Sequence, residues 1–325
     1  MPSIRRILVA VKNPLSRSQP AVEKAAQLAK ALGAHLEIFH ALTQPLYADL
    51  YVTGQGSAKD LERKTHTLIC ERLETIATRL RTDAKVTVAA EWDFPAFEAV
   101  IRRAGRIKAD LVVAERHAAR HFPRWLLHLN DWELLRACPV PLLLVKSARG
   151  YRHPVVLAAV DPTHFAKPAA LDEAILKVGA TIAHALRGTL HVVHAHPSVH
   201  GGTRATDPFN PTKAAQMNAE FNAAAKAQLN KLLKSSTIPR ARRHLKGEPP
   251  ADAIDAIARG VSSDVLVMGA LSRSGLKGMF IGNTAEDLLD RLTCDLLIVK
   301  PLHFKHRVPK ARRGARLIPE TPVVP

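Results

Sequence analysis

A glycine-rich stretch lies between a strand-like apolar segment and a helix-like segment near the end of the chain. It contains Gly269, Gly275, Gly278 and Gly282, with two cations, Arg273 and Lys277, among them. Glycines before a helix let backbone N–H groups approach phosphate oxygens, and the helix N-terminus adds partial positive charge. The stretch is therefore a candidate phosphate-binding loop. A glycine-rich connection that has lost its ligand explains the same residues, and the sequence leaves both readings open.

The 16 histidines raise a second possibility, a zinc site. Five lie on or after one predicted strand, or on loops that could approach the same sheet end: His191, His194, His196, His164 and His200. Side-chain alternation puts His194 and His196 on one face, and Asp161 could add an oxygen ligand. Solvated or strand-end histidines explain this pattern without a metal. We therefore predict no metal site.

No group of residues supports catalysis. The chain has no Gly-x-Ser-x-Gly turn between a strand and a helix, so hydrolase chemistry has no support. The segment 115–117, Glu-Arg-His, is interpreted as a solvated loop. Glu286 and Asp287 fall in the first turn of a predicted helix, where the helix dipole explains them. A slow ATPase would need a general base and a Mg²⁺ ligand set, and neither is recognisable. We predict no catalytic residues and no enzymatic activity.

The cysteines and the apolar segments indicate a cytoplasmic protein. Cys70, Cys138 and Cys294 are odd in number and far apart, so they form no disulfide framework or Cys-x-x-Cys metal pair. Apolar runs reach about six residues, whereas a membrane span needs roughly 20. The apolar residues 7–11 fall short of the apolar core of a secretory signal and predict a first strand.

The net charge of +18 invites an acidic partner such as nucleic acid. The excess is spread, with +8 in residues 1–150, +5 in 151–300 and +5 in 301–325. Aromatic residues are only 5% of the chain, and no basic stripe with interleaved aromatics is present. The last segment alternates cations with Pro and Gly, which predicts a disordered tail. This tail is expected to be a solubilising extension, with a salt-sensitive attraction to nucleic acid or anionic lipid as the alternative.

The sequence repeats itself once. Four apolar segments of the first half, which begin near residues 7, 33, 110 and 142, return in the second half at offsets of 149, 155, 154 and 154 residues. Such a small drift over four segments indicates that one domain has been duplicated. We predict a first domain over residues 1–150, a second over 151–301 and a basic tail over 302–325.

Strand-like and helix-like segments alternate within each half. The strands are short, rich in Val, Leu and Ile, and apolar on both faces, as in parallel sheets covered by helices. The expected strands are 7–11, one within the segment 33–42, 86–90, 110–114 and 142–146, and then 154–160, 189–195, 241–245, 264–268 and 295–300. The prediction is an α/β protein with two tandem doubly wound five-stranded parallel sheets. The two halves are expected to pair as an intramolecular pseudo-dimer, and the chain could pair again as a homodimer.

Residues 264–301 strongly resemble the universal stress protein family. The segment runs Asp-Val-Leu-Val-Met-Gly269, through the glycine-rich loop, to Gly-Asn-Thr-Ala-Glu286 and Cys-Asp-Leu-Leu-Ile-Val-Lys-Pro301. Together with the tandem layout, it is similar to the E type of that family. The resemblance covers residues 5–301. It implies an adenine nucleotide alpha hydrolase-like fold and a cytoplasmic stress-response factor that is rarely an enzyme. Many members of this family bind ATP or a related nucleotide, and others do not.

The resemblance also implies site residues in the second half. Nucleotide-binding members carry Gly-x2-Gly-x9-Gly-(Ser/Thr) after the fourth strand. Gly269, Ser272, Gly282 and Asn283 stand at these positions, with Thr284 next. Ser272 replaces the second glycine, and Asn283, whose amide can still donate, replaces the final hydroxyl. Asp161 matches the acid that meets the adenine, and Ala195 matches the residue whose backbone reads the base edge.

The first half departs from the pattern. Lys12 stands at the acid position, Ala41 corresponds to Ala195, and the loop after residue 114 has no glycine. We therefore predict that an adenine nucleotide, if bound, occupies the second half only. The alternative function is a basic protein that associates with nucleic acid through its surface charge and its tail.

Overall fold

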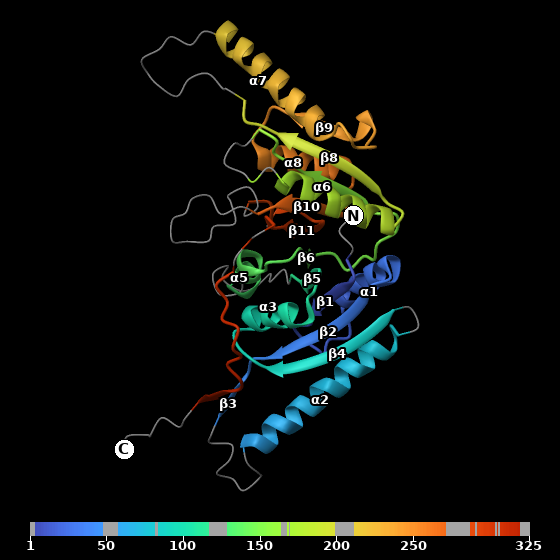
Figure 1. Ribbon diagram of the computed structural model, residues 1–325, viewed down its shortest axis with the longest axis vertical. Coiled ribbons are helices and arrows are strands. Elements are labelled where there is room, and N and C mark those ends of the chain that lie inside the picture. The colour runs from blue at the N-terminus through green and yellow to red at the C-terminus, as the bar shows by residue number, and fades with distance from the viewer. Residues whose placement is uncertain are drawn as a thin grey trace, which may run out of the picture. The chain divides into compact units, whose positions relative to one another are not determined.

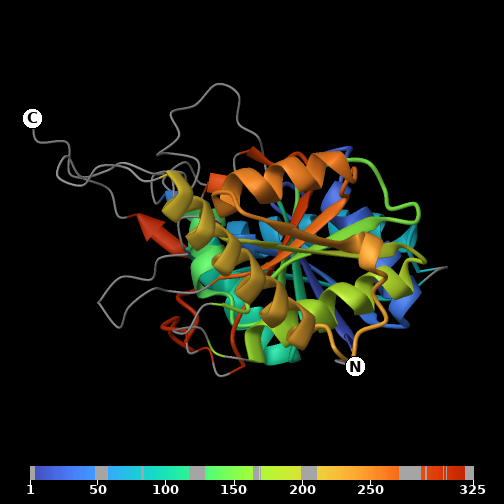
Figure 2. The ribbon, with the colours of Figure 1, turned by 90° about the horizontal axis from the view of Figure 1, so that it is seen from above.

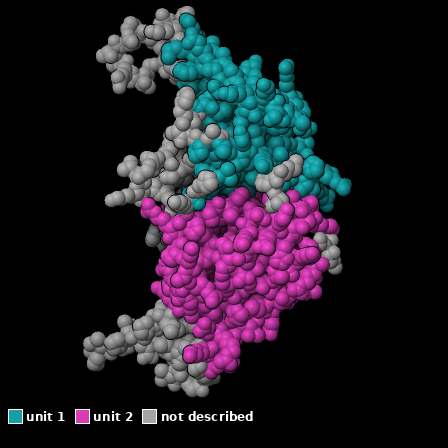
Figure 3. Space-filling model, in the orientation of Figure 1, with its two compact units in different colours: residues 1–2, 151–304 teal, residues 3–150, 305–325 magenta. Residues whose placement is uncertain are grey.

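The chain divides into two units. The computed structural model describes residues 4–47, 58–81, 84–116, 129–163, 168, 170–198, 211–270, 287–289, 291–302, 304 and 306–318. The N-terminal unit comprises residues 3–150 together with 305–325, and the C-terminal unit comprises residues 151–304 (magenta and teal in Figure 3). The last segment of the chain is therefore part of the unit formed by the first half.

The N-terminal unit is a parallel α/β sheet with helices on both faces (Figure 1). Its elements are β1 (Arg6–Ala10), α1 (Pro20–Leu32), β2 (His35–Leu42), β3 (Pro45–Tyr47), α2 (Ala58–Thr78), β4 (Lys85–Trp92), α3 (Ala96–Ile107), β5 (Leu111–Glu115), α5 (Leu129–Ala137), β6 (Leu142–Val145) and β12 (Arg316–Ile318). The strand order is β4-β2-β1-β5-β6. The chain thus reverses direction across the sheet between β1 and β5.

The C-terminal unit repeats this topology. Its elements are β7 (Val155–Ala159), α6 (Ala170–Ala185), β8 (Thr189–Ala195), α7 (Pro211–Leu232), a 3₁₀ turn (Arg240–Arg242), β9 (Arg243–Lys246), α8 (Pro250–Gly260), β10 (Val265–Gly269) and β11 (Asp295–Val299). The order β9-β8-β7-β10-β11 matches that of the N-terminal unit strand for strand. Figure 2 shows α6 and α8 on opposite sides of these strands. The equal order confirms the α/β fold of two tandem parallel sheets that the repeat predicts.

The central strands form the core of each unit. In the N-terminal unit, Leu8 on β1 and Val112 on β5 are fully buried, and in the C-terminal unit so are Leu157 on β7 and Leu266 on β10. The registers pair Leu8 with Val112 and Leu157 with Leu266. Helices cover both faces of these strands, so apolar residues occupy successive positions without alternation.

The tail differs from its prediction. Residues 316–318 form β12, which pairs in parallel with β3 in a separate two-stranded sheet. Upstream, the backbone N–H of Arg313 donates to the buried carboxylate of Asp93. Residues 306–318 thus make defined contacts where the composition predicts disorder. Two of the tail cations, Arg312 and Arg313, pair with carboxylates of the first half.

No helix in the described part of the chain is long and apolar enough to cross a membrane.

Candidate functional site

Three of the predicted site residues lie at the carboxyl ends of adjacent strands in the C-terminal unit. Ala195 ends β8, Gly269 ends β10, and Asp161 follows β7, which lies between them. In this strand order, β7 and β10 flank the point where the chain changes direction across the sheet. Doubly wound sheets bind ligands at the carboxyl edge at this point. The fold thus brings Asp161, Ala195 and Gly269 to one edge.

Asp161 presents a partly accessible carboxylate. Its side chain is 44% exposed, and its Oδ1 accepts a hydrogen bond of 2.9 Å from the hydroxyl of Thr163. Its backbone N–H donates to Asp172 Oδ1 over 3.0 Å. The backbone contact fixes the position of Asp161 at the end of β7. Its carboxylate can still accept hydrogen bonds from a ligand.

Gly269 has a packing reason to be glycine. A Cβ at this position would lie 2.9 Å from Leu171 Cδ2 and 3.2 Å from Ile175 Cδ1, both on α6. The close approach of α6 to the end of β10 therefore leaves little room for a Cβ, which would displace the ends of these two buried side chains. This packing reason holds with or without a phosphate ligand.

The remaining members of the predicted phosphate loop, Ser272, Gly282, Asn283 and Thr284, lie outside the described residues, as do Arg273 and Lys277. Their role remains a prediction from the sequence.

A buried histidine of β8 contacts the main chain of the residue that precedes Asp161. His194 is fully buried, and its Nδ1 lies 3.1 Å from the carbonyl oxygen of Val160. Because the carbonyl can only accept, Nδ1 carries the proton. Burial lowers the pKa of His194, so the ring is neutral at pH 7. His40 makes the same contact in the N-terminal unit, over 2.7 Å to Val11, and burial lowers its pKa too. The repeated contact indicates a structural role for both rings.

The histidines considered for zinc have separate partners. His191 Nδ1 lies 3.1 Å from His244 Nε2, and His196 Nε2 lies 2.9 Å from Asn222 Oδ1. His164 and His200 are outside the described residues. Among the residues that are described, no three His, Cys, Asp or Glu side chains gather as metal ligands. The geometry gives no support to a zinc site here.

The equivalent edge of the N-terminal unit carries an ion pair. Lys12, which follows β1, places its Nζ 2.5 Å from Asp131 Oδ1 in the first turn of α5. Asp131 is buried. A cation thus stands where the C-terminal unit has Asp161, and an acid of the same unit neutralises it. This edge also ends in Glu115 instead of a glycine.

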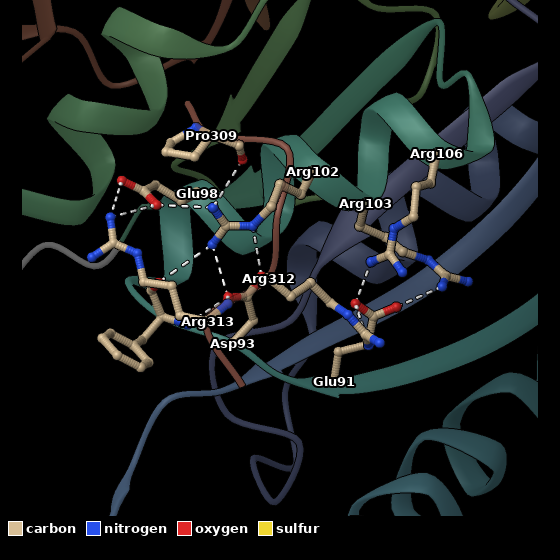
Figure 4. Close-up of polar contacts among 10 residues, drawn as sticks. Glu91, Asp93, Glu98, Arg102, Arg103, Arg106, Pro309, Arg312 and Arg313 are labelled. Atoms are coloured by element: carbon tan, nitrogen blue, oxygen red, sulfur yellow. Dashed lines mark hydrogen bonds and ion pairs between the residues drawn. The ribbon is translucent and has the colours of Figure 1, made fainter. Parts of the chain in front are cut away.

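The sequence did not reveal a network of acids and arginines in the N-terminal unit (Figure 4). It joins the end of β4, helix α3 and the tail, and we call it the tail-docking site. Its members are Glu91, Asp93, Phe94, Glu98, Arg102, Arg103, Arg106, Pro309, Arg312 and Arg313. The one local signal was the spacing of Glu98 and Arg102, four residues apart on a helix. The tail partners are more than 200 residues away and left no local signal.

Known proteins share this layout. The profile of the universal stress protein family matches residues 3–146 and again residues 154–300. Universal stress protein E of Salmonella typhi is 27% identical over 314 residues, which cover 92% of this chain and 95% of that protein. Universal stress protein E of Escherichia coli strain K12 gives the same identity and coverage. A solved structure from Pseudomonas aeruginosa PAO1, described as functionally unknown, is 25% identical with a TM-score of 0.70 and covers 92% of this chain and 93% of that one. The tandem domains and the shared fold show that this chain belongs to the universal stress protein family and is similar to its E type.

Proposed function

We propose that this chain is a cytoplasmic stress-response factor without catalytic activity, and that its C-terminal unit binds an adenine nucleotide. Asp161 and the backbone of Ala195 recognise the base. Gly269, Ser272, Gly282, Asn283 and Thr284 hold the phosphates. Backbone N–H groups at the start of a helix are suited to this because they are unpaired donors beside a positive dipole end.

One observation carries the proposal. Asp161, Ala195 and Gly269 share the carboxyl edge around the reversal point of the C-terminal sheet, and Asp161 has an accessible carboxylate. At the matching edge of the N-terminal unit, Lys12 stands in place of Asp161 and pairs with Asp131. Nucleotide binding is therefore proposed for one unit only.

Thermal unfolding with and without Mg²⁺-ATP tests this proposal. A ligand that binds only the folded state at 100 times its Kd adds about 2.7 kcal/mol of stability. We expect the parent to shift upward in Tm and the variants Asp161→Ala and Gly282→Val to lose the shift. Asp252→Ala removes another exposed carboxylate of the same unit and should keep it. No shift at millimolar ATP would mean that the altered loop no longer binds nucleotide.

A second candidate rests on the net charge of +18. Nucleic acid would bind without sequence preference, and affinity would fall steeply with salt. Two tail cations are already engaged, because Arg312 lies 3.6 Å from Glu91 and Arg313 lies 3.1 Å from Glu98. Fewer cations therefore remain for phosphates. Fluorescence anisotropy with labelled RNA and DNA at two salt concentrations separates this candidate, since Asp161→Ala would leave such binding unchanged.

A further inference from the structure

The tail-docking site is built around a buried ion pair. The side chain of Arg102 is 3% exposed and that of Asp93 is fully buried. Arg102 Nε and Nη2 donate to the two carboxylate oxygens of Asp93 over 2.7 and 2.8 Å. Burial alone would lower the pKa of Arg102, but hydrogen bonds to Asp93 and Glu98 outweigh it, and the pKa is raised. Arg102 therefore stays charged, and its planar fork fixes the geometry of the two bonds to Asp93.

The tail supplies one of the hydrogen-bond acceptors of the Arg102 guanidinium. A guanidinium has N–H groups for five hydrogen bonds. Besides its two bonds to Asp93, Arg102 donates to Glu98 over 2.9 Å, to the carbonyl of Phe94 over 3.3 Å and to the carbonyl of Pro309 over 3.2 Å. The last acceptor belongs to the tail. A buried donor without its acceptor is costly, so the site favours an occupant with a main-chain carbonyl at this point.

Arg313 is the side chain that the site recognises. Its Nη2 lies 3.1 Å from both carboxylate oxygens of Glu98, and its backbone N–H donates to Asp93 Oδ1 over 3.0 Å. Its guanidinium carbon lies 5.6 Å from the centre of the Phe94 ring, within cation–π range. Figure 4 shows the guanidinium of Arg313 beside Glu98. A carboxylate beside an aromatic face selects a planar guanidinium over the point charge of lysine.

The main chain of the tail is also held. Beyond Arg313, β12 pairs with β3 in parallel register, from Arg316 with Pro45 to Ile318 with Tyr47. Addition of a strand to an exposed strand, combined with side-chain anchors, is a recurring way in which domains bind extended peptides. The site thus combines a main-chain acceptor position, an arginine anchor and a strand-pairing edge within ten residues of tail.

Two acids of the site contact tail cations as well. Glu91 and Glu98 already pair with arginines of α3. Arg312 lies 3.6 Å from Glu91 and Arg313 lies 3.1 Å from Glu98. Each of these two acids therefore accepts a second cation from the tail.

We propose that this surface of the N-terminal unit is a recognition site for extended, arginine-bearing peptide segments of partner proteins. Residues 306–318 occupy it in cis and must leave before a partner binds. This site and the nucleotide edge belong to different units, and the proposal does not depend on nucleotide binding.

The cis occupant can be displaced. The side chains of Arg312 and Arg313 are 55% and 45% exposed, and exposed ion pairs contribute little individually. Because the tail is part of the same chain, it is nevertheless present at the site at an effective concentration on the order of millimolar. A free peptide therefore competes poorly with the intact tail and much better with a weakened one.

Anisotropy of a labelled peptide with the sequence of residues 306–318 tests the proposal on the full-length chain. We expect the Arg313→Ala chain to bind this peptide at least about tenfold more tightly than the parent, because its own tail competes less. Arg307→Ala is the matched control. Arg307 is an exposed tail cation without an ion pair to any described residue, so this chain should bind as the parent does.

Specificity is tested on the Arg313→Ala chain. A peptide with alanine at the position of Arg313, and the additional protein variant Glu98→Gln, should each weaken binding at least about tenfold. In the parent, an excess of the native peptide should speed hydrogen exchange at the amide of Arg313, which reports release of the tail even if a variant is unstable. Equal binding by a scrambled peptide, or equal binding by parent and Arg313→Ala chains, would overturn the proposal. Dimerisation of the Arg313→Ala chain with the parent would make a second copy's tail the occupant and also overturn it.

Discussion

Arg102 and Asp93 form the most deeply buried of the ion pairs between described residues. Removing one partner leaves the other charge buried and unpaired, which costs about 3–5 kcal/mol. We predict that Arg102→Ala lowers the free energy of unfolding of the N-terminal unit by about this amount, measured by urea denaturation. Arg63→Ala breaks the exposed pair with Asp60 and should cost about 1 kcal/mol or less. Similar losses in both variants would contradict the role assigned to burial.

The buried histidines predict a pH dependence. Burial lowers the pKa of His40 and His194 below the ordinary value of 6.5. Between the lowered pKa and 6.5, the unfolded chain binds more protons than the folded chain, so stability rises with pH in this window. We expect the urea midpoint to fall as the pH drops below about 6.5 and to level off above it. His40→Asn and His194→Asn keep a donor near Nδ1 and should reduce this slope. If the urea midpoint of both variants depends on pH as strongly as that of the parent, these two histidines are not the cause of the pH dependence.

At the scale of elements, the packing of α6 on β10 explains Gly269. A Cβ would lie 2.9 Å from Leu171, so Gly269→Ala should lower the stability of the C-terminal unit by about 1–3 kcal/mol through overpacking. Gly260 ends α8 with nothing within 4 Å of a Cβ, so Gly260→Ala is the control and should cause no loss. Calorimetry measures both. A Gly269→Ala variant as stable as the parent would contradict the packing argument.

The strands that build the two sheets could be predicted because their information is local. Short runs of Val, Leu and Ile and their return at offsets of 149 to 155 residues predicted eight of the strands in these sheets. The other two, β4 and β9, were expected from the alternation of strands and helices. β3 and β12 were missed because each is only three residues long and becomes a strand by pairing with the other. The tail-docking site was missed for the same reason. Arg313 and Glu98 are each unremarkable in the sequence until the fold brings them within 3.1 Å.

The candidate nucleotide site was predictable only in part. The position of Asp161 followed from its place after an apolar strand, since parallel strands deliver their carboxyl ends to one edge. The ion-pair partner of Lys12 could not be predicted, because Asp131 lies 119 residues away in the sequence. The packing role of Gly269 was also hidden, because it depends on how closely α6 approaches β10.

At the scale of the whole molecule, duplication produced two units with the same strand order. Their carboxyl edges carry different residues, and we call them the unequal edges. Pairing of the two domains as an intramolecular pseudo-dimer remains a prediction. Co-expression of residues 1–150 and 151–304 as separate chains, without the tail that docks on the first unit, tests it. We expect the two to copurify as a complex with one copy of each, and recovery of only separate species would contradict the pairing.

The unequal edges give the central claim, which is one nucleotide site per chain. Isothermal titration of the full-length chain with Mg²⁺-ATP measures the number of sites directly. The account predicts one ATP per chain, no binding by Asp161→Ala, and unchanged stoichiometry in Lys12→Ala, whose unit lacks the glycine after β5. Two sites per chain, or binding that survives Asp161→Ala, would contradict it.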